Sequence, residues 1–327
     1  MSIRIIKHGI QDVFYDSGRF GHQHIGINPG GVMDHFAMQV ANALALNHPN
    51  EAVLEMHFPA AEILFETDAL IAIAGADFSP GINQGTITNH QPIMVKAGAV
   101  LKFNKPVQGA RAYLAVHDGF QLTKWLGSYS TNLLCKTGGH NGKALFTNDV
   151  VGLKSPHFQL KRNEGFKTLP FAANVKEAYK DGSIRLMAGR HYDELTEESK
   201  RSFENNEFEI TGDSNRMGYR LQSGPMFCKE ERSLLSTAVT MGTIQLLPNG
   251  QLIMLMADHQ TIGGYPMIAH VVSADLPGLA QHVPGKKIRF SMISLHDAQQ
   301  AFVNQQQHIR FIQNACNLRM NQYLVHV

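Results

Sequence analysis

The chain has 327 residues, of which 43% are hydrophobic and 17% are charged, with 29 Gly and 13 Pro. This composition excludes a coiled coil and a disordered chain, and the length suits two domains. The 29 Lys and Arg residues against 27 Asp and Glu residues argue against a nucleic-acid-binding or membrane-surface protein. We therefore expect neither nucleic acid nor a membrane among the partners.

The first clear element in chain order is a helix over residues 35–46. Phe36, Val40 and Leu44 recur there at helical spacing, and Asp34 is a natural N-cap. Elsewhere, short apolar runs end at Gly, Pro or Asn, which predicts strands over residues 69–74, 93–95, 100–103, 112–116, 184–187, 243–247, 252–256 and 287–290. Shorter helical patterns cover residues 193–205 and 297–311. The sequence predicts a mainly β protein with a few helices, built as barrels or sandwiches.

Domain division and location are inferred from composition. The polar stretch 161–180 is the predicted linker between domains at 1–170 and 171–327. The uncharged run 233–257 contains Pro248-Asn249-Gly250, which predicts a turn between two strands and argues against a membrane span. No signal peptide is recognisable, and the three Cys residues form no CxxC pair. We expect a cytoplasmic, reduced protein.

The first polar cluster comprises residues 16–21 and 30–34, both rich in glycine. One interpretation is a pair of loops that present Arg19 and Asp34 to a polar substrate. The alternative is a tight turn followed by a helix cap.

The second polar cluster is residues 213–221. Arg216 and Arg220 flank Gly218, and on a strand all three would share a face. Planar guanidinium groups suit a carboxylate or a phosphate, although two surface arginines would show the same pattern.

The third polar cluster, residues 256–266, follows an apolar strand. It combines hydrogen-bonding side chains with a glycine pair that allows close approach of a ligand to the backbone: Asp258, Gln260, Thr261, Gly263, Gly264 and Tyr265. We expect this loop to form one wall of the main pocket, near Arg216, and to bind an amide or ureido group. The alternative is a hairpin whose polar groups satisfy one another. His22-Gln23-His24 lacks a third ligand, so no metal site is predicted.

Further matches accompany these clusters: Gly75-Ala76-Asp77, residues 109–113, Gly127-Ser128, Ser130-Thr131 and residues 242–245. With them, the chain resembles the family of biotin-dependent carboxyltransferases, or allophanate hydrolase subunit 2, which includes the C-type subunit of 5-oxoprolinase and KipA-like proteins. The resemblance implies two cyclophilin-like β-barrel domains. It also implies the C-type subunit of an ATP-dependent 5-oxoprolinase, which opens 5-oxoproline to glutamate with a KipI-like B-type subunit and an A-type subunit.

Within this interpretation the candidate catalytic residues are Asp34 and Asp258, and the candidate substrate-binding residues are Arg19, Arg216, Gln260, Thr261 and Tyr265. Gly263 and Gly264 would allow a ligand to approach the backbone closely. ATP binds either this chain or a partner. One alternative is a carboxyltransferase acting on urea or a related amide, with biotin on another protein. The other is a KipA-like regulator that binds a kinase-inhibitor partner.

Overall fold

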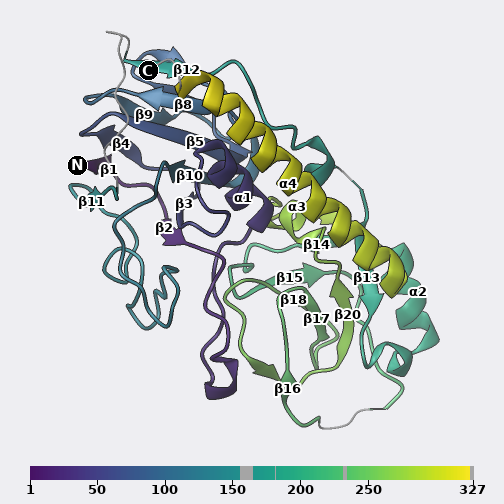
Figure 1. Ribbon diagram of the computed structural model, residues 1–327. Coiled ribbons are helices and arrows are strands. Elements are labelled where there is room, and N and C mark those ends of the chain that lie inside the picture. Colours follow the sequence, from purple (N-terminus) through teal and green to yellow (C-terminus); the bar gives the residue numbers. More distant parts are fainter. Residues whose placement is uncertain (155–164, 181, 231–233, 325–327) are drawn as a thin grey trace. The chain divides into compact units, whose positions relative to one another are not determined.

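The computed structural model describes residues 1–154, 165–180, 182–230 and 234–324, and four α-helices lie in this part of the chain among many short strands (Figure 1). The predicted fold class, mainly β with a few helices, is confirmed. Two compact units are present. The first, here the sandwich unit, comprises Met1–Gly18, Asp34–Glu177 and Gln307–Val327. The second, the barrel unit, comprises Arg19–Met33 and Ala178–Gln306.

The chain crosses between these units more than once, so the linear division at residue 170 stays a prediction about domains. Residues 161–164 of the predicted linker lie outside the described part of the chain.

The sandwich unit contains two six-stranded sheets. The first has the order β11 (Val150–Gly152), β1 (Ser2–Lys7), β4 (Glu62–Phe65), β9 (Val100–Phe103), β6 (Pro80–Ile82) and β7 (Gly85–Thr86). The second has the order β12 (Phe166–Thr168), β8 (Pro92–Val95), β5 (Ala69–Asp77), β10 (Gln108–Val116), β3 (Val53–Met56) and β2 (Asp12–Tyr15). One apolar core joins the inner faces of both sheets.

Strand β5 is apolar on both faces, because both faces are covered. Ile71 and Ile73 point into the core between the sheets, whereas Leu70 belongs to a separate cluster with Met94 and Met320. The helix α1 (His35–Leu44) packs on β5 and β10. Its N-cap is Asp34, as predicted, with the carboxylate accepting a hydrogen bond from the Ala37 N–H.

The predicted stop of this strand at Gly75 is wrong, since β5 continues to Asp77. Gly75 has φ of 82°, a value that glycine adopts without strain, and the pairing with β10 shifts register beyond it.

Asp16 connects two of the sequence matches that lie more than a hundred residues apart. Its carboxylate accepts hydrogen bonds from the hydroxyls of Ser128 and Ser130, at 2.5 and 2.6 Å, and from the N–H groups of Tyr129 and Gly18, at 2.6 and 2.9 Å. Asp16 is 6% exposed, so these donors replace water around a buried anion. Asp16 of the first cluster therefore has a structural role.

The barrel unit is built on one eight-stranded sheet. Its order is β21 (Lys287–Ile288), β14 (Phe208–Ile210), β15 (Gly218–Gln222), β18 (Leu252–Leu255), β17 (Thr243–Leu246), β20 (Met267–Val271), β13 (Ile184–Ala188) and β22 (Phe290–Met292). The two end strands, β21 and β22, are joined by Arg289 alone. The ends of the sheet therefore lie next to one another, and the sheet closes into a nearly complete barrel, as predicted.

The strands of the barrel alternate between a core face and an outer face. Ile244 and Leu246 of β17 and Met254 of β18 belong to the barrel core. Gln245 and Ile253 lie between them in sequence and therefore face outward. A short ribbon of β16 (Thr237–Ala238) and β19 (Ile262–Gly263) interrupts the third cluster, which the sequence predicted as a loop.

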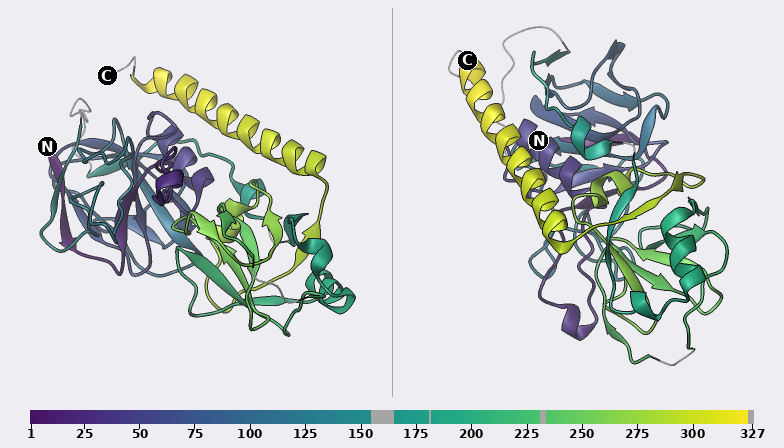
Figure 2. Two further views of the ribbon diagram at one scale, coloured as in Figure 1. Left: turned by 90° about the horizontal axis from the view of Figure 1, so that it is seen from below. Right: turned by 90° about the vertical axis from the view of Figure 1, so that its right-hand side faces the viewer.

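Three further α-helices complete the described chain. They are α2 (Glu197–Asn205), α3 (Leu276–Ala280) and α4 (Leu295–Leu324). The helix predicted over 193–205 is split, because Thr196 caps α2 after the short 3-10 turn Tyr192–Glu194. The predicted C-terminal helix is longer than expected, and Figure 2 shows α4 as one continuous rod. None of the helices in the described residues is long and apolar enough to cross a membrane.

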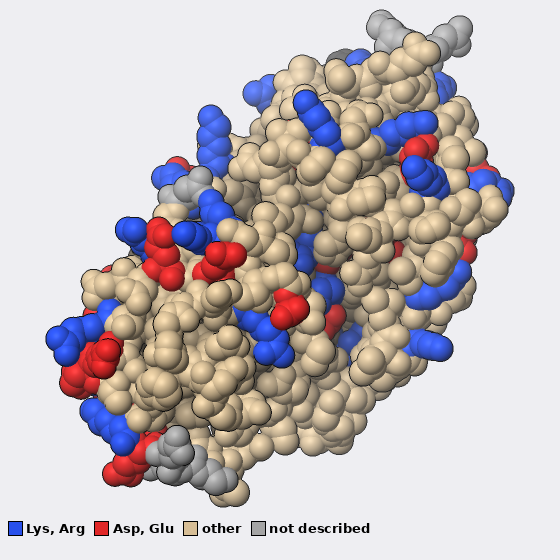
Figure 3. All heavy atoms as spheres, turned by 180° about the vertical axis from the view of Figure 1, so that it is seen from behind, with Lys and Arg blue, Asp and Glu red and all other residues tan. Residues whose placement is uncertain are grey.

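Charged residues are interspersed over the surface. On the face in Figure 3, Lys and Arg alternate with Asp and Glu among larger uncharged areas, in keeping with the near-neutral net charge of +2.

A buried carboxyl group in β2 generates a prediction about pH. Asp12 is 1% exposed, and burial raises its pKa to about 7, although the N–H groups of Gly9 and Ala61 lower it. The raised pKa means that the folded state holds this proton more tightly than the unfolded chain. The stabilisation is therefore complete below about pH 4 and is lost as the pH rises through about 7.

We expect Asp12→Asn to remove this pH dependence. From pH 5 to pH 8, the free energy of unfolding of the variant should rise relative to that of the wild type by about 1–3 kcal/mol, because Asn cannot ionise. Urea denaturation at the two pH values measures this. An equal wild-type-to-variant difference at both values would contradict the assignment.

Candidate functional site

Within the barrel unit, the buried Arg216 forms an ion pair with Asp258, whose side chain is 31% exposed. Arg216 Nε donates to Asp258 Oδ2 at 2.7 Å, and Nη2 lies 3.2 Å from Oδ1. Nη2 also donates to the backbone carbonyl of Gly31. The backbones of the two residues are also hydrogen-bonded, since the Asp258 N–H donates to the Arg216 carbonyl at 2.8 Å. Arg216 is 7% exposed, so its charge is balanced by this carboxylate rather than by water.

The prediction that Arg216 shares a strand face with Arg220 is wrong. The strand β15 begins at Gly218, so Arg216 precedes it and turns toward Asp258, whereas Arg220 is exposed on the outer face.

Arg19 lies against the same segment of the barrel unit. It is 1% exposed. A Cβ added to Gly30 would lie 3.0 Å from Arg19 Nη1 and 3.6 Å from Asp258 Oδ1. The Arg19 N–H donates to the Pro29 carbonyl at 2.8 Å, which closes the segment on itself. Three predicted site residues, Arg19, Arg216 and Asp258, thus gather around Gly30 and Gly31 and fix this turn to the barrel.

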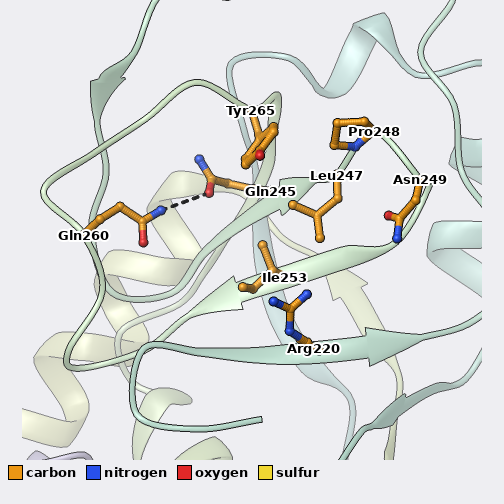
Figure 4. A pocket seen from close by; sticks show the side chains of 8 residues that line it. All are labelled: Arg220, Gln245, Leu247, Pro248, Asn249, Ile253, Gln260 and Tyr265. Atoms are coloured by element: carbon orange, nitrogen blue, oxygen red, sulfur yellow. Dashed lines mark hydrogen bonds between the residues drawn. The ribbon is translucent and has the colours of Figure 1, made fainter. Parts of the chain in front are cut away.

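A separate open pocket of about 380 Å³ lies on the outer face of the barrel (Figure 4). It is lined by residues of β15, β17 and β18, the turn after β17 and the third cluster: Arg220, Gln245, Leu247, Pro248, Asn249, Ile253, Gln260 and Tyr265. Gln260 and Tyr265, predicted to bind substrate, form one wall together. Arg220, rather than Arg216, is the arginine at this pocket.

Gln245 has an unusual environment in this pocket. Its side chain is fully buried, and Nε2 has no hydrogen-bond partner in the part of the chain that the structure describes. Oε1 accepts only a long contact from Gln260 Nε2, at 3.5 Å. A buried donor left without a partner costs about 1–3 kcal/mol of stability. Gly263 lies directly over this amide, since an added Cβ would come within 2.4 Å of Nε2.

The remaining residues of the third cluster are held by the backbone. His259 Nδ1 lies 2.5 Å from the Gln260 carbonyl, to which it donates, and burial lowers the pKa of this imidazole. The Thr261 carbonyl accepts from the Val239 N–H, and Gly264 lies near Ser236. These contacts hold Gln260 and Tyr265 at the rim of the pocket, where both are exposed.

Asp34 belongs to the sandwich unit. Its carboxylate caps α1, and its own N–H donates to the Tyr113 hydroxyl at 3.0 Å. Tyr113 lies directly opposite Glu55 in the sheet, and burial, reinforced by the charges of Glu55 and Asp34, raises its pKa. The cap interpretation of Asp34 is therefore observed, and a catalytic role stays a prediction.

Gln245, which lines the pocket, was not singled out from the sequence, and Arg216 was favoured over Arg220. A signal for Gln245 was present, because a glutamine interrupts an otherwise apolar strand, residues 243–247. Among the described residues, no group of three or more His, Cys, Asp or Glu side chains is placed to hold a metal ion.

Comparisons with known proteins identify the family. A family model described as "Carboxyltransferase domain, subdomain A and B" matches residues 25–292. The chain is 34% identical to the C-type subunit of 5-oxoprolinase from Escherichia coli, over 94% of this chain and 96% of that protein. It is 33% identical to the C-type subunit of 5-oxoprolinase from Haemophilus influenzae, over 86% of this chain and 88% of that protein.

A solved structure shares the fold. The crystal structure of the K. lactis urea amidolyase superposes with a TM-score of 0.86 at 27% identity, covering 95% of this chain and 20% of that one. These matches confirm the resemblance seen in the sequence. The chain therefore belongs to the family of the carboxyltransferase domain, subdomains A and B.

Proposed function

We propose that this chain is the C-type subunit of an ATP-dependent 5-oxoprolinase, which opens 5-oxoproline to glutamate together with a KipI-like B-type subunit and an A-type subunit. The observation that carries the proposal is the end-to-end match with a relative of that name, which covers 94% of this chain and 96% of the relative. By contrast, the chain spans only 20% of the urea amidolyase that shares its fold.

The pocket of the barrel unit suits a small cyclic amide. Its lining offers amide donors and acceptors in Gln245 and Gln260, a phenol in Tyr265 and apolar surface in Ile253. Gly263 and Gly264 let the backbone approach a ligand, and Thr261 adds a hydroxyl next to Gln260. These residues orient the lactam group in the proposal.

The ion pair of Arg216 and Asp258 has a positioning role in this proposal. Asp258 holds Arg216, and both fix the turn at Gly30-Gly31. Arg19 contributes positive charge beside them, which would balance a phosphate or carboxylate. Asp34 is kept as a candidate base.

Ring opening requires activation of a stable amide. The lactam oxygen would take the γ-phosphoryl group of ATP, with release of ADP, and water would then add to the lactam carbon. The ring C–N bond would break as the nitrogen takes a proton, and hydrolysis of the resulting acyl phosphate would release phosphate and glutamate. The sequence contains no Gly-x-x-x-x-Gly-Lys-Ser/Thr loop, so the proposal assigns no residue of this chain to ATP.

A carboxyltransferase is the second candidate, because the family description and the urea amidolyase structure both favour it. In that case the same pocket would receive the ureido ring of a biotin carried by another protein, and the reaction would depend on biotin.

Reconstitution tests the choice between the two. The purified chain alone should form no glutamate, since a shared site needs all its walls to position the reactants. Mixed with B-type and A-type partners, it should form glutamate that depends on both ATP and 5-oxoproline and that avidin does not inhibit. Avidin-sensitive carboxylation, or robust turnover by the single chain, would contradict the proposal.

Arg216→Lys should impair the reconstituted enzyme although the charge is retained. A lysine cannot donate to Asp258 and to the Gly31 carbonyl with the planar geometry of a guanidinium. We expect a loss of about 1.5–3 kcal/mol in free energy of unfolding, together with reduced turnover.

The matched control is Arg185→Lys. Arg185 makes the same two-pronged contact, with Asp275, but its side chain is 40% exposed. The Arg185→Lys variant should lose less than about 1 kcal/mol in free energy of unfolding, and turnover should be unchanged. Wild-type stability and kinetics in the Arg216 variant would show that the ion pair of Arg216 and Asp258 does not position the site.

A further inference from the structure

The geometry of the pocket points to a pair of specificity-determining residues, and we propose that Gln245 and Arg220 together select a cyclic amide that carries a carboxylate. Gln245 recognises the lactam edge, and Arg220 recognises the carboxylate. This inference rests on the proposed function and names the residues that would distinguish its substrate from the ring-opened product.

The register of the barrel sheet places the two side chains for this task. Arg220 of β15 lies directly opposite Ile253 of β18, and Ile253 lies directly opposite Gln245 of β17. The three residues form one row across three adjacent strands on the outer face. Arg220 and Gln245 are therefore separated by two strand spacings, roughly 10 Å between their backbones. Figure 4 shows the two side chains on either side of Ile253.

Gln245 presents a donor and an acceptor side by side. A carboxamide pairs through two parallel hydrogen bonds with any group that shows a carbonyl oxygen and an N–H on one edge. A lactam does so, because its ring forces the amide to be cis. An open-chain amide is trans and shows only one of the two groups on a given edge. Gln245 is thus chemically matched to a ring-closed amide.

Within the described chain, the Gln245 amide has an unpartnered donor and an acceptor with one long hydrogen bond. Nε2 is fully buried and has no partner among the described residues, so a lactam carbonyl would supply the missing acceptor. Oε1 is reached only by Gln260 Nε2, at 3.5 Å, which a lactam N–H would replace. Gln260 is exposed at the rim and has room to move aside. An apolar residue at position 245 would avoid the unpartnered donor. The presence of a glutamine at this position of an apolar strand therefore indicates a ligand.

Arg220 meets the other end of the ligand. The residue is exposed, and its guanidinium forms no ion pair within the described part of the chain, whereas the buried Arg216 is committed to Asp258. A carboxylate bound here would receive the planar two-pronged contact that arginine favours. The methylene groups of the ring would then rest on Ile253 between the two polar ends.

Binding assays with four variants of the full-length chain test the pair. Isothermal titration uses 5-oxoproline and 2-pyrrolidinone, which has the lactam without the carboxylate. Gln245→Met should weaken both ligands by at least about tenfold, because neither amide edge is then paired. Arg220→Gln should weaken 5-oxoproline by at least about tenfold and leave 2-pyrrolidinone within about twofold.

The controls are Gln222→Met on β15 and Arg201→Gln on α2, both exposed and outside the pocket lining, which should bind both ligands as the wild type does. The melting temperature separates recognition from folding. Gln245→Met should melt no lower than the wild type, because it removes an unpartnered buried donor. A lower melting temperature combined with weaker binding would make Gln245 structural and overturn its role. Since Arg220 is exposed, Arg220→Gln should leave the melting temperature unchanged and so test the pocket alone.

The same variants in the reconstituted assembly separate this inference from the proposed function. If the assembly forms glutamate and both variants keep the wild-type KM for 5-oxoproline, the pair is not the recognition element although the function stands. If the assembly forms no glutamate, the proposed function fails, and the two-ligand pattern in the binding assay still decides the pair. Wild-type binding of both ligands by both variants, or no binding by the wild-type chain and assembly, overturns the inference.

Discussion

The register of the barrel sheet is the constraint on which the candidate site depends. The two end strands of the sheet are linked by Arg289 alone, and each strand between them is paired on both sides, so none of these inner strands can slip without breaking two pairings. Because side chains alternate strictly along each strand, the register that sends Ile244 and Met254 into the core also sends Gln245 and Ile253 outward. The row of Arg220, Ile253 and Gln245 is thus a consequence of core packing.

Charge is used in two different ways within the same unit. Arg216 is buried and forms an ion pair with Asp258, and its contact with the Gly31 carbonyl contributes rigidity at Gly30 and Gly31. Arg220 lies in the open and keeps its guanidinium available. A buried arginine that is already paired with a carboxylate is poorly suited to capture a ligand, whereas an exposed arginine beside an apolar surface can bind and release one. The division explains why the two arginines, four residues apart, have different tasks.

Much of the fold was predictable because its signals are local. Turn residues marked the strands 243–247 and 252–256, and Asp34 marked the start of α1. It was harder to predict which chain segments form each unit, since the inclusion of Arg19–Met33 in the barrel unit depends on contacts such as the one between Gly31 and Arg216, 185 positions apart. The polar clusters indicated Gln260 and Tyr265, which both line the pocket of the barrel unit, and their role in binding stays a prediction. They could not distinguish Arg216 from Arg220, because the start of β15 at Gly218 is decided by pairing with β18.

In the proposed recognition of a lactam, the buried amide of Gln245 is the contact point. Its side-chain N–H signals can be assigned in a ¹⁵N-labelled chain by comparison with Gln245→Met and followed during titration with 5-oxoproline. We expect these signals to shift in a saturable way as a hydrogen bond forms at Nε2, and 2-pyrrolidinone to produce a similar shift. Signals of Gln245 that stay in place while 5-oxoproline saturates the chain would contradict the proposed recognition.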